Sequence, residues 1–270
     1  MKSVVAILAL AATATAQYVR CAAEQPPAEI TRPVGIDQRL LADIADPEIA
    51  ALSVQTYVHV VTTSAAAATY NQAIVNRQMD VLNDAYAPAG ISFTLAGTDF
   101  TVNSQWAAAT QGSTAERQMK TALRKGDYGT LNLYFLSNLG GGLLGWCTFP
   151  SSSATLVNDG CINLASSMPG GAATNYNQIG LTAVHEVGHW FGAYHVFQGQ
   201  SCSGSGDQVS DTPIQSTATN GCPVGKDSCP NSAGVDSIRN YMDYSYDSCM
   251  NTFSAGQITR MNTFYNQYRA

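Results

Sequence analysis

The sequence predicts an α/β (α+β) protein in which strands and helices come first and an irregular, cysteine-rich part ending in a helix comes last. Three observations predict this order. Apolar and polar side chains alternate over much of Ser53–Val61, as in a strand. Apolar side chains recur at helical spacing along Tyr70–Ala87. After His195 the chain is rich in Gly, Ser, Asp, Pro and Cys, so we expect disulfides or metal to hold it together.

The first 16 residues are typical of a secretory signal peptide. A short basic start precedes an apolar run over Val4–Ala14, and small residues then predict cleavage after Ala16. The apolar run is too short to span a bilayer comfortably, and no later stretch is long enough to do so. We therefore expect a secreted, extracellular protein without a membrane anchor.

Composition restricts the partners and the domain count. The 270 residues suggest one domain, or one domain plus a processed segment, and 45% apolar residues are enough for a sizeable core. The net charge is −6 and no basic cluster is present, so a nucleic-acid partner is not expected, and we expect a monomer. The proline-bearing residues 17–50 are interpreted as a propeptide outside the core, ahead of a catalytic domain over 51–270.

The elements of that domain follow in order. The first helix stops at Pro88, and a second opens with a capping box at Ser113 and Glu116 and runs to about Arg124. Residues 140–149 are Gly-rich and irregular. Further strands are expected over Ile91–Ala96, Phe100–Asn103, Leu131–Leu136, Thr155–Val157 and Cys161–Leu164. Further helices are expected over Ile179–Ala193 and from Ser254 to near Arg269.

The helix over Ile179–Ala193 carries the chemistry. His185 and His189 lie four residues apart, so they project from one face and can reach the same metal ion. Glu186 lies about 100° round the helix, beside that ion without ligating it. Gly192 can adopt a left-handed conformation and turn the chain, which brings His195 back as a third ligand.

Three neutral imidazoles and a water make a tetrahedral zinc site with one open position. Zinc lowers the pKa of bound water from ~15.7 to ~7, Glu186 accepts the proton, and hydroxide attacks the scissile carbonyl. Glu186 then passes the proton to the leaving amine. The motif thus predicts a zinc metalloendopeptidase with one Zn²⁺ per subunit, acting on extracellular proteins or peptides.

Other readings of the same residues are weighed against this one. One alternative is a catalytically silent binding module on the same scaffold, but such a protein would be expected to lose Glu186 first. Another is a zinc amidase, which a screen with non-peptide amides would distinguish from a peptidase. Zinc hydrolases that take a later glutamate as third ligand are excluded, because no glutamate follows Glu186. The remaining histidine, His59, is expected to be an ordinary strand residue.

The zinc motif with its glycine and third histidine resembles that of the metzincins, and Asn240–Tyr244 resembles their Met-turn. Within the metzincins the chain resembles the pappalysins, especially the fungal secreted metalloproteases, over roughly residues 50 to 270. Besides the zinc motif, the stretches that carry this resemblance are Gly141–Gly145, Asn175–Gln178, Asp211–Pro213 and Val235–Met250.

The resemblance implies a metzincin fold, with a twisted mixed sheet and its helices above the cleft (51–192) and an irregular, disulfide-bonded part below (193–270). Met242 would form an apolar floor under the ligands, and Tyr244 would stabilise the oxyanion. A substrate would lie extended along an edge strand near residues 140–149. The implied disulfides are Cys202–Cys229, Cys222–Cys249 and Cys147–Cys161.

Relatives also bind calcium in the loop after the third histidine. Asp207 and Asp211 are candidate Ca²⁺ ligands, and a solvated acidic loop is the alternative. Some relatives cut beside Arg or Lys by means of an acidic residue in the pocket that follows the bond. Ser248 stands at that position here, with Asp247 adjacent, which departs from their pattern.

Cys21 is the odd one of seven cysteines. In several metzincins a leader cysteine occupies the fourth zinc position and keeps the enzyme latent, because a thiolate is a good zinc ligand. Ala22 stands where relatives have glycine, and an unpaired or intermolecularly bridged cysteine is the alternative. We expect removal of residues 17–50 to activate the enzyme.

Overall fold

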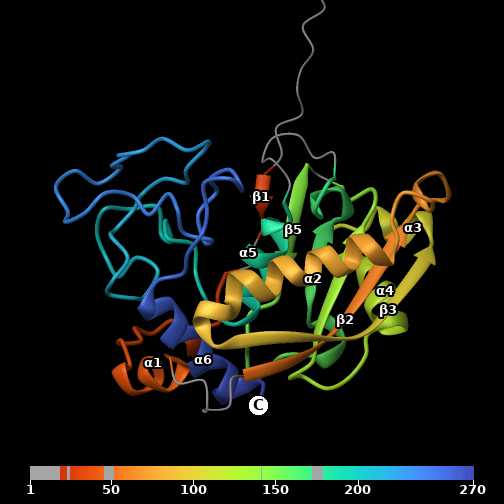
Figure 1. The fold of residues 1–270 in the computed structure, drawn as a ribbon, viewed down its shortest axis with the longest axis horizontal. Coiled ribbons are helices and arrows are strands. Elements are labelled where there is room, and N and C mark those ends of the chain that lie inside the picture. Colours follow the sequence, from red (N-terminus) through yellow and green to blue (C-terminus); the bar gives the residue numbers. More distant parts are fainter. Residues whose placement is uncertain (1–18, 23–24, 46–51, 141, 172–178) are drawn as a thin grey trace, which may run out of the picture.

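A computed structural model describes residues 19–22, 25–45, 52–140, 142–171 and 179–270 (Figure 1). The expected signal peptide, much of the boundary near residue 50, Gly141 and the whole stretch Asn175–Gln178 fall outside these residues. No helix in the described ranges has the length and apolar character needed to cross a bilayer.

A six-stranded mixed sheet forms the centre of the fold, in the order β1-β5-β6-β4-β2-β3. Neighbouring strands run parallel except β5 and β6, which are antiparallel. The strands are β1 (Val19–Cys21), β2 (Leu52–Thr62), β3 (Ile91–Val102), β4 (Leu131–Leu136), β5 (Leu143–Cys147) and β6 (Cys161–Leu164).

Strand β3 is one continuous strand, so the two strands expected over residues 91–103 are a single element. Thr56 pairs with Leu95, whereas Tyr57 pairs with Gly97, which leaves Ala96 as an extra residue opposite β2. A β-bulge accommodates such a residue and lets pairing continue. The glycine therefore marks a bulge within the strand and not its end.

Helices cover both faces of the sheet. On one face, α2 (Gln72–Tyr86) and α5 (Leu181–Trp190) pack against the larger core, and Figure 1 shows α2 crossing in front of the strands. On the other face, α3 (Ser104–Ala107) and α4 (Thr114–Leu123) cover a second core that includes Trp146. The helix that carries the zinc motif is thus held between the sheet and the lower part of the chain.

Three local expectations are wrong. Leu143–Cys147, within the stretch 140–149 that the sequence predicts to be irregular, form strand β5 because they pair with β1 and β6. Residues Leu156–Asn158 form a 3₁₀ helix, not a strand, because Asn158 N donates to the Thr155 carbonyl within a tight turn. At α4 only half of the capping box forms. Ser113 accepts from Glu116 N, but the Glu116 carboxylate accepts from Gly112 N and from the Trp146 indole instead.

Beyond His195 the chain has little regular structure until α6 (Ala255–Tyr268), which opens with a complete capping box formed by Ser254 and Gln257. Figure 1 shows this part, in blue tones, as loops beside the sheet. The disulfides Cys202–Cys229 and Cys222–Cys249 bridge this part, and Cys147–Cys161 links β5 to β6. All three are the pairs that the resemblance implies.

The described residues of the stretch 17–50, here called the leader, pack into the protein, contrary to the expectation that they lie outside the core. The leader includes α1 (Gln38–Ala45) and a short 3₁₀ helix, Ala28–Ile30. Ile30 is fully buried in a small apolar cluster with Phe149, Tyr194 and Phe264. The buried Arg260 guanidinium donates to the Ile30 carbonyl at 2.7 Å. A buried guanidinium needs acceptors, and the leader backbone supplies them.

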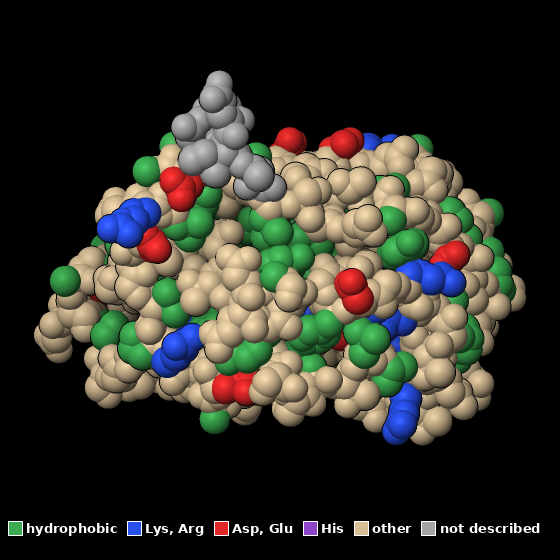
Figure 2. Space-filling model, turned by 90° about the horizontal axis from the view of Figure 1, so that it is seen from below, with side chains coloured by type: hydrophobic (Ala, Val, Ile, Leu, Met, Phe, Trp, Pro, Cys, Tyr) green, Lys and Arg blue, Asp and Glu red, His purple; other side chains and the backbone are tan. Residues whose placement is uncertain are grey.

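The surface carries few charges. Figure 2 shows scattered acidic and basic side chains on one face, with apolar side chains in small groups between them and no histidine. This agrees with a chain in which only 12% of the residues are charged.

Candidate metal centre and active site

Helix α5 begins and ends at specific polar contacts. Its first turn has backbone N–H groups without helical partners, and the buried Asp247 carboxylate accepts from Ile179 N (3.1 Å) and Leu181 N (3.2 Å). All ten residues of the helix are buried. At the other end Gly192 has φ of 97°, in the left-handed region, as expected for the turn toward His195.

The structure brings the three histidines together. Nε2 of His195 lies 3.1 Å from Nε2 of His189 and 3.2 Å from Nε2 of His185. The thiol of Cys21 joins them, and the four ligand atoms all lie within 4.8 Å of one another. His59, in contrast, lies in β2 and contacts Asp99 and Asn132.

The hydrogen bonds of the rings decide which nitrogen faces the centre. Nδ1 of His185 donates to the Tyr241 carbonyl (2.7 Å), and Nδ1 of His189 donates to the Ala193 carbonyl (2.8 Å). A carbonyl only accepts, so the Nε2 atom of each neutral ring carries a lone pair. Burial lowers the pKa of His185 well below its usual value and that of His189 to about 4, which keeps both rings neutral.

Three imidazole nitrogens and a thiol gathered around one position are the donor set that zinc prefers. The carbonyl partners of His185 and His189 are the outer-shell contacts that hold such ligands in place. The residues present therefore fit a zinc ion, which His185, His189 and His195 would hold.

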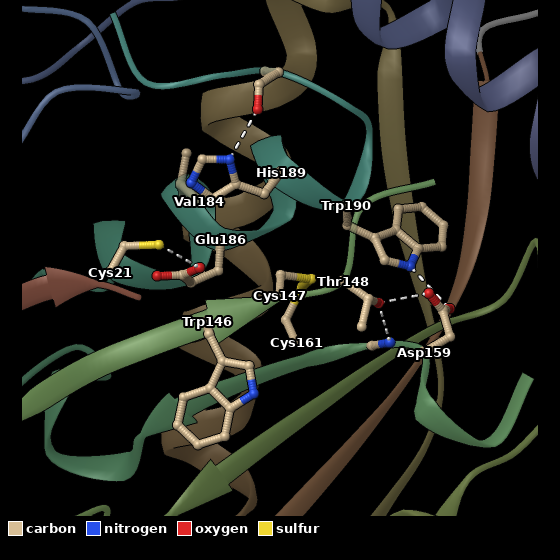
Figure 3. Close-up of a disulfide and its surroundings, with 12 residues drawn as sticks. Cys21, Trp146, Cys147, Thr148, Asp159, Cys161, Val184, Glu186, His189 and Trp190 are labelled. Atoms are coloured by element: carbon tan, nitrogen blue, oxygen red, sulfur yellow. Dashed lines mark hydrogen bonds between the residues drawn. A yellow bond between two sulfur atoms is a disulfide. The ribbon is translucent and has the colours of Figure 1, made fainter. Parts of the chain in front are cut away.

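Glu186 lies beside this centre with its carboxylate fully buried. Burial raises the pKa of Glu186 well above its usual value, and the Cys21 thiol and the Arg20 charge partly oppose that effect. The Cys21 thiol donates to Oε2 at 3.3 Å, and Figure 3 shows the two side chains pointing toward each other. Oε1 accepts no hydrogen bond from the described residues. A buried carboxylate of raised pKa is suited to accept and return a proton.

Met242 lies under the zinc helix. Its side chain is fully buried, and a Cβ atom added at Gly188 would overlap its sulfur. The glycine of the motif therefore lets the helix approach the methionine closely. The preceding residue, Tyr241, supplies the carbonyl that holds His185, so this turn supports the centre through both backbone and side chain.

Tyr244 follows the same turn and faces the centre. Its ring centroid lies 5.1 Å from that of His195 and 5.6 Å from that of His185. Its hydroxyl donates to the Cys21 carbonyl at 2.8 Å. The tyrosine therefore already binds a peptide carbonyl next to the three histidines.

The leader strand β1 lies in the cleft, along the edge of the sheet at β5. Cys21 pairs with Gly145 in parallel register, and Ala22 N donates to the Gly145 carbonyl at 3.1 Å. The adjacent Arg20 is fully buried, and its guanidinium contacts Asp247 at 2.7 Å and the Ser245 carbonyl at 2.8 Å. Sequence reasoning missed this ion pair; the only signal was a charged residue next to the odd cysteine.

The two candidate calcium ligands have separate partners. Asp207 is buried and accepts from Thr212, and burial raises the pKa of Asp207 to about 7. Asp211 accepts from the Ser254 hydroxyl and from Gly256 N at the start of α6. Calcium binding at these residues stays a prediction.

Comparison with known proteins places this geometry in a family. Residues 127–266 match the peptidase family described as pregnancy-associated plasma protein-A. The chain is 56% identical over 225 residues to an extracellular metalloprotease of Podospora anserina, covering 81% of this chain and 75% of that protein. It is 49% identical to an extracellular metalloprotease of Pyricularia oryzae, covering 93% and 90%.

A solved structure agrees. Mature mirolysin of Tannerella forsythia, in complex with a cleaved peptide, superimposes with a TM-score of 0.66 at 31% identity and covers 79% of this chain and 91% of that one. The metzincin fold and the resemblance to the pappalysins that the sequence predicts are confirmed.

Proposed function

Because this chain belongs to the pregnancy-associated plasma protein-A (pappalysin) family of metallopeptidases, we propose that it is a secreted zinc endopeptidase whose ligands are His185, His189 and His195. The observation that carries the proposal is the convergence of three Nε2 atoms beside the buried Glu186 carboxylate. The relatives named as extracellular metalloproteases support secretion and action on extracellular proteins or peptides.

Zinc at the three histidines would supply a Lewis acid that polarises the scissile carbonyl and lowers the pKa of a water molecule. Glu186 accepts one proton from that water, whose oxygen adds to the carbonyl carbon. As the C–N bond breaks, Glu186 returns the proton to the amine nitrogen. The raised pKa of the buried Glu186 suits both halves of this exchange.

Tyr244 would donate a hydrogen bond to the oxyanion that develops on the scissile carbonyl. Its contact with the Cys21 carbonyl supports this role, because the hydroxyl already points at a peptide oxygen beside the centre. Met242 and the Tyr241 carbonyl would keep the zinc helix and His185 in place.

The test uses the leader-free enzyme on casein, with zinc content measured in parallel. Activity should be lost with a chelator and return with zinc, and Glu186→Ala should keep its zinc while losing at least a hundredfold in kcat. His189→Ala should lose the metal, whereas the matched control His59→Ala should keep one zinc per chain. A folded Glu186→Ala enzyme with parental activity would refute the proposal.

We also propose that the leader keeps the enzyme latent through Cys21, whose thiol lies within 4.8 Å of the imidazole nitrogens. A thiolate there would occupy the position that water needs. The cobalt-substituted precursor should show thiolate-to-cobalt charge-transfer absorption, and Cys21→Ala should abolish it and raise basal cleavage. If the Cys21→Ala precursor has the parent's spectrum and is as silent, the thiol does not block the metal.

A further inference from the structure

The side of β5 that faces the zinc helix has no side chain at Gly145. Leu144 and Trp146 point into the core under α4, whereas Cys147 points toward α5. Successive residues of a strand alternate, so Gly145 shares the side of Cys147. Figure 3 shows this arrangement, with Glu186 on one side of the strand and Trp146 on the other.

Glu186 fills the space that this glycine leaves. A Cβ atom at Gly145 would lie 2.9 Å from Cγ of Glu186 and 3.1 Å from its Oε1. It would also lie 2.8 Å from the Ile162 carbonyl oxygen. The backbone of Gly145 is not in the left-handed region, so the conformation alone would accept alanine. What sets this residue apart is the lack of room for a Cβ atom between the Glu186 side chain and the Ile162 carbonyl, and not backbone strain.

The same residue receives the strand that lies in the cleft. Its carbonyl accepts from Ala22 N, and it pairs with Cys21, whose thiol donates to Glu186. A side chain here would push the carboxylate away from the edge strand, at the place where a peptide pairs with that edge. We propose that Gly145 is a positioning residue for Glu186, which rests on the proposed function for its catalytic consequence.

The test compares Gly145→Ala in the leader-free enzyme with the control Gly97→Ala, which lies on β3 at the opposite edge of the sheet. A Cβ atom at Gly97 would meet only the Tyr57 ring, at 3.1 Å. Because a displacement of about 1 Å can cost ~100-fold in rate, Gly145→Ala should lower kcat by roughly that factor. KM should change less than about threefold and one zinc should remain, since the ligands are untouched. The control should keep parental kcat, and a parental kcat for Gly145→Ala would overturn the inference.

A second measurement separates the two close contacts. Glu186→Ala removes both carboxylate-side atoms that a Cβ at Gly145 would meet, but leaves the Ile162 carbonyl. Gly145→Ala should therefore lower the unfolding midpoint less in the Glu186→Ala protein than in the parent. If Gly145→Ala lowers the unfolding midpoint equally in both proteins, the added Cβ atom clashes with the Ile162 carbonyl and not with Glu186, and the inference is overturned. This comparison needs no activity, so a parent that cleaves no peptide would refute the proposed function alone.

Discussion

The ion pair between Arg20 and Asp247 should hold the leader in the cleft, and Arg20→Ala in the precursor tests this. Both side chains are fully buried, and Nη2 lies 2.7 Å from Oδ1. Removing one partner of a buried pair costs about 3–5 kcal/mol, because it leaves a charge without compensation. The other Asp247 oxygen still accepts from Ile179 N and Leu181 N at the helix N-terminus. That contact offsets part of the loss, so we expect about 3 kcal/mol.

A loss of about 3 kcal/mol corresponds to a roughly 100-fold larger population of precursor with the leader undocked. Limited proteolysis reads this population, because the cleavage rate follows the open fraction when docking is fast. The parent is the precursor carrying Glu186→Ala, so that any peptidase activity of the protein itself does not contribute to the cleavage. Cleavage within the leader should therefore be about 100-fold faster in Arg20→Ala.

The matched control is Arg32→Ala, also in the leader, whose guanidinium bonds to Gln267 on the exposed surface. Such a surface substitution should change stability by about 0.5 kcal/mol or less. If leader proteolysis and the urea unfolding midpoint of Arg20→Ala equal those of Arg32→Ala, the buried ion pair does not hold the leader.

Three further predictions concern single side chains. Tyr244→Phe should lower kcat by about 10²–10³-fold with little change in KM, as expected for the loss of a hydrogen-bond donor to the oxyanion. A steady-state kcat within about threefold of the parent's would exclude that role. Burial raises the pKa of Asp207 above its unfolded value to about 7, so its contribution to stability is complete below about pH 4 and declines toward pH 7. In calcium-free buffer, the free energy of unfolding measured in urea should fall by up to ~1.4 kcal/mol per pH unit between these pH values. Asp207→Asn should remove this pH dependence, and a variant that keeps it would contradict the assignment. The buried Asp159 pairs with Arg269 (3.0 Å) and accepts from the Trp190 indole. Asp159→Asn should therefore lower the free energy of unfolding by about 3 kcal/mol, measured by calorimetry. An unchanged unfolding transition would show that this pair is not stabilising.

The leader contacts the catalytic domain at two separate places. In the cleft, β1 extends the sheet and brings Cys21 to the histidines. At a second place, Ile30 packs against Tyr194 and Phe264, and the Arg260 guanidinium donates to the Ile30 carbonyl. If residues 17–50 are a propeptide, as we propose, its removal would have to break both sets of contacts.

The parts of the site that sequence predicts are those encoded within one turn or two of a helix. His185 and His189 project from the same face because a helix repeats every 3.6 residues, and Gly192 marks the turn that returns His195. Met242 and Tyr244 have no such local signal. They are identified only through family resemblance, because the methionine lies 47 positions after the third histidine along an irregular chain.

The sequence by itself therefore determined the helix that carries the metal-binding motif, the place of Glu186 on it and most of the strands and helices beyond residue 52, since each depends on periodicity within a short segment. Only the tertiary structure decided that Arg20 meets Asp247, 227 residues away, and that Glu186 rests against Gly145. It also decided that Val19–Cys21 becomes an edge strand. Three residues are too few to show a period, and contacts between distant segments depend on how the whole chain packs.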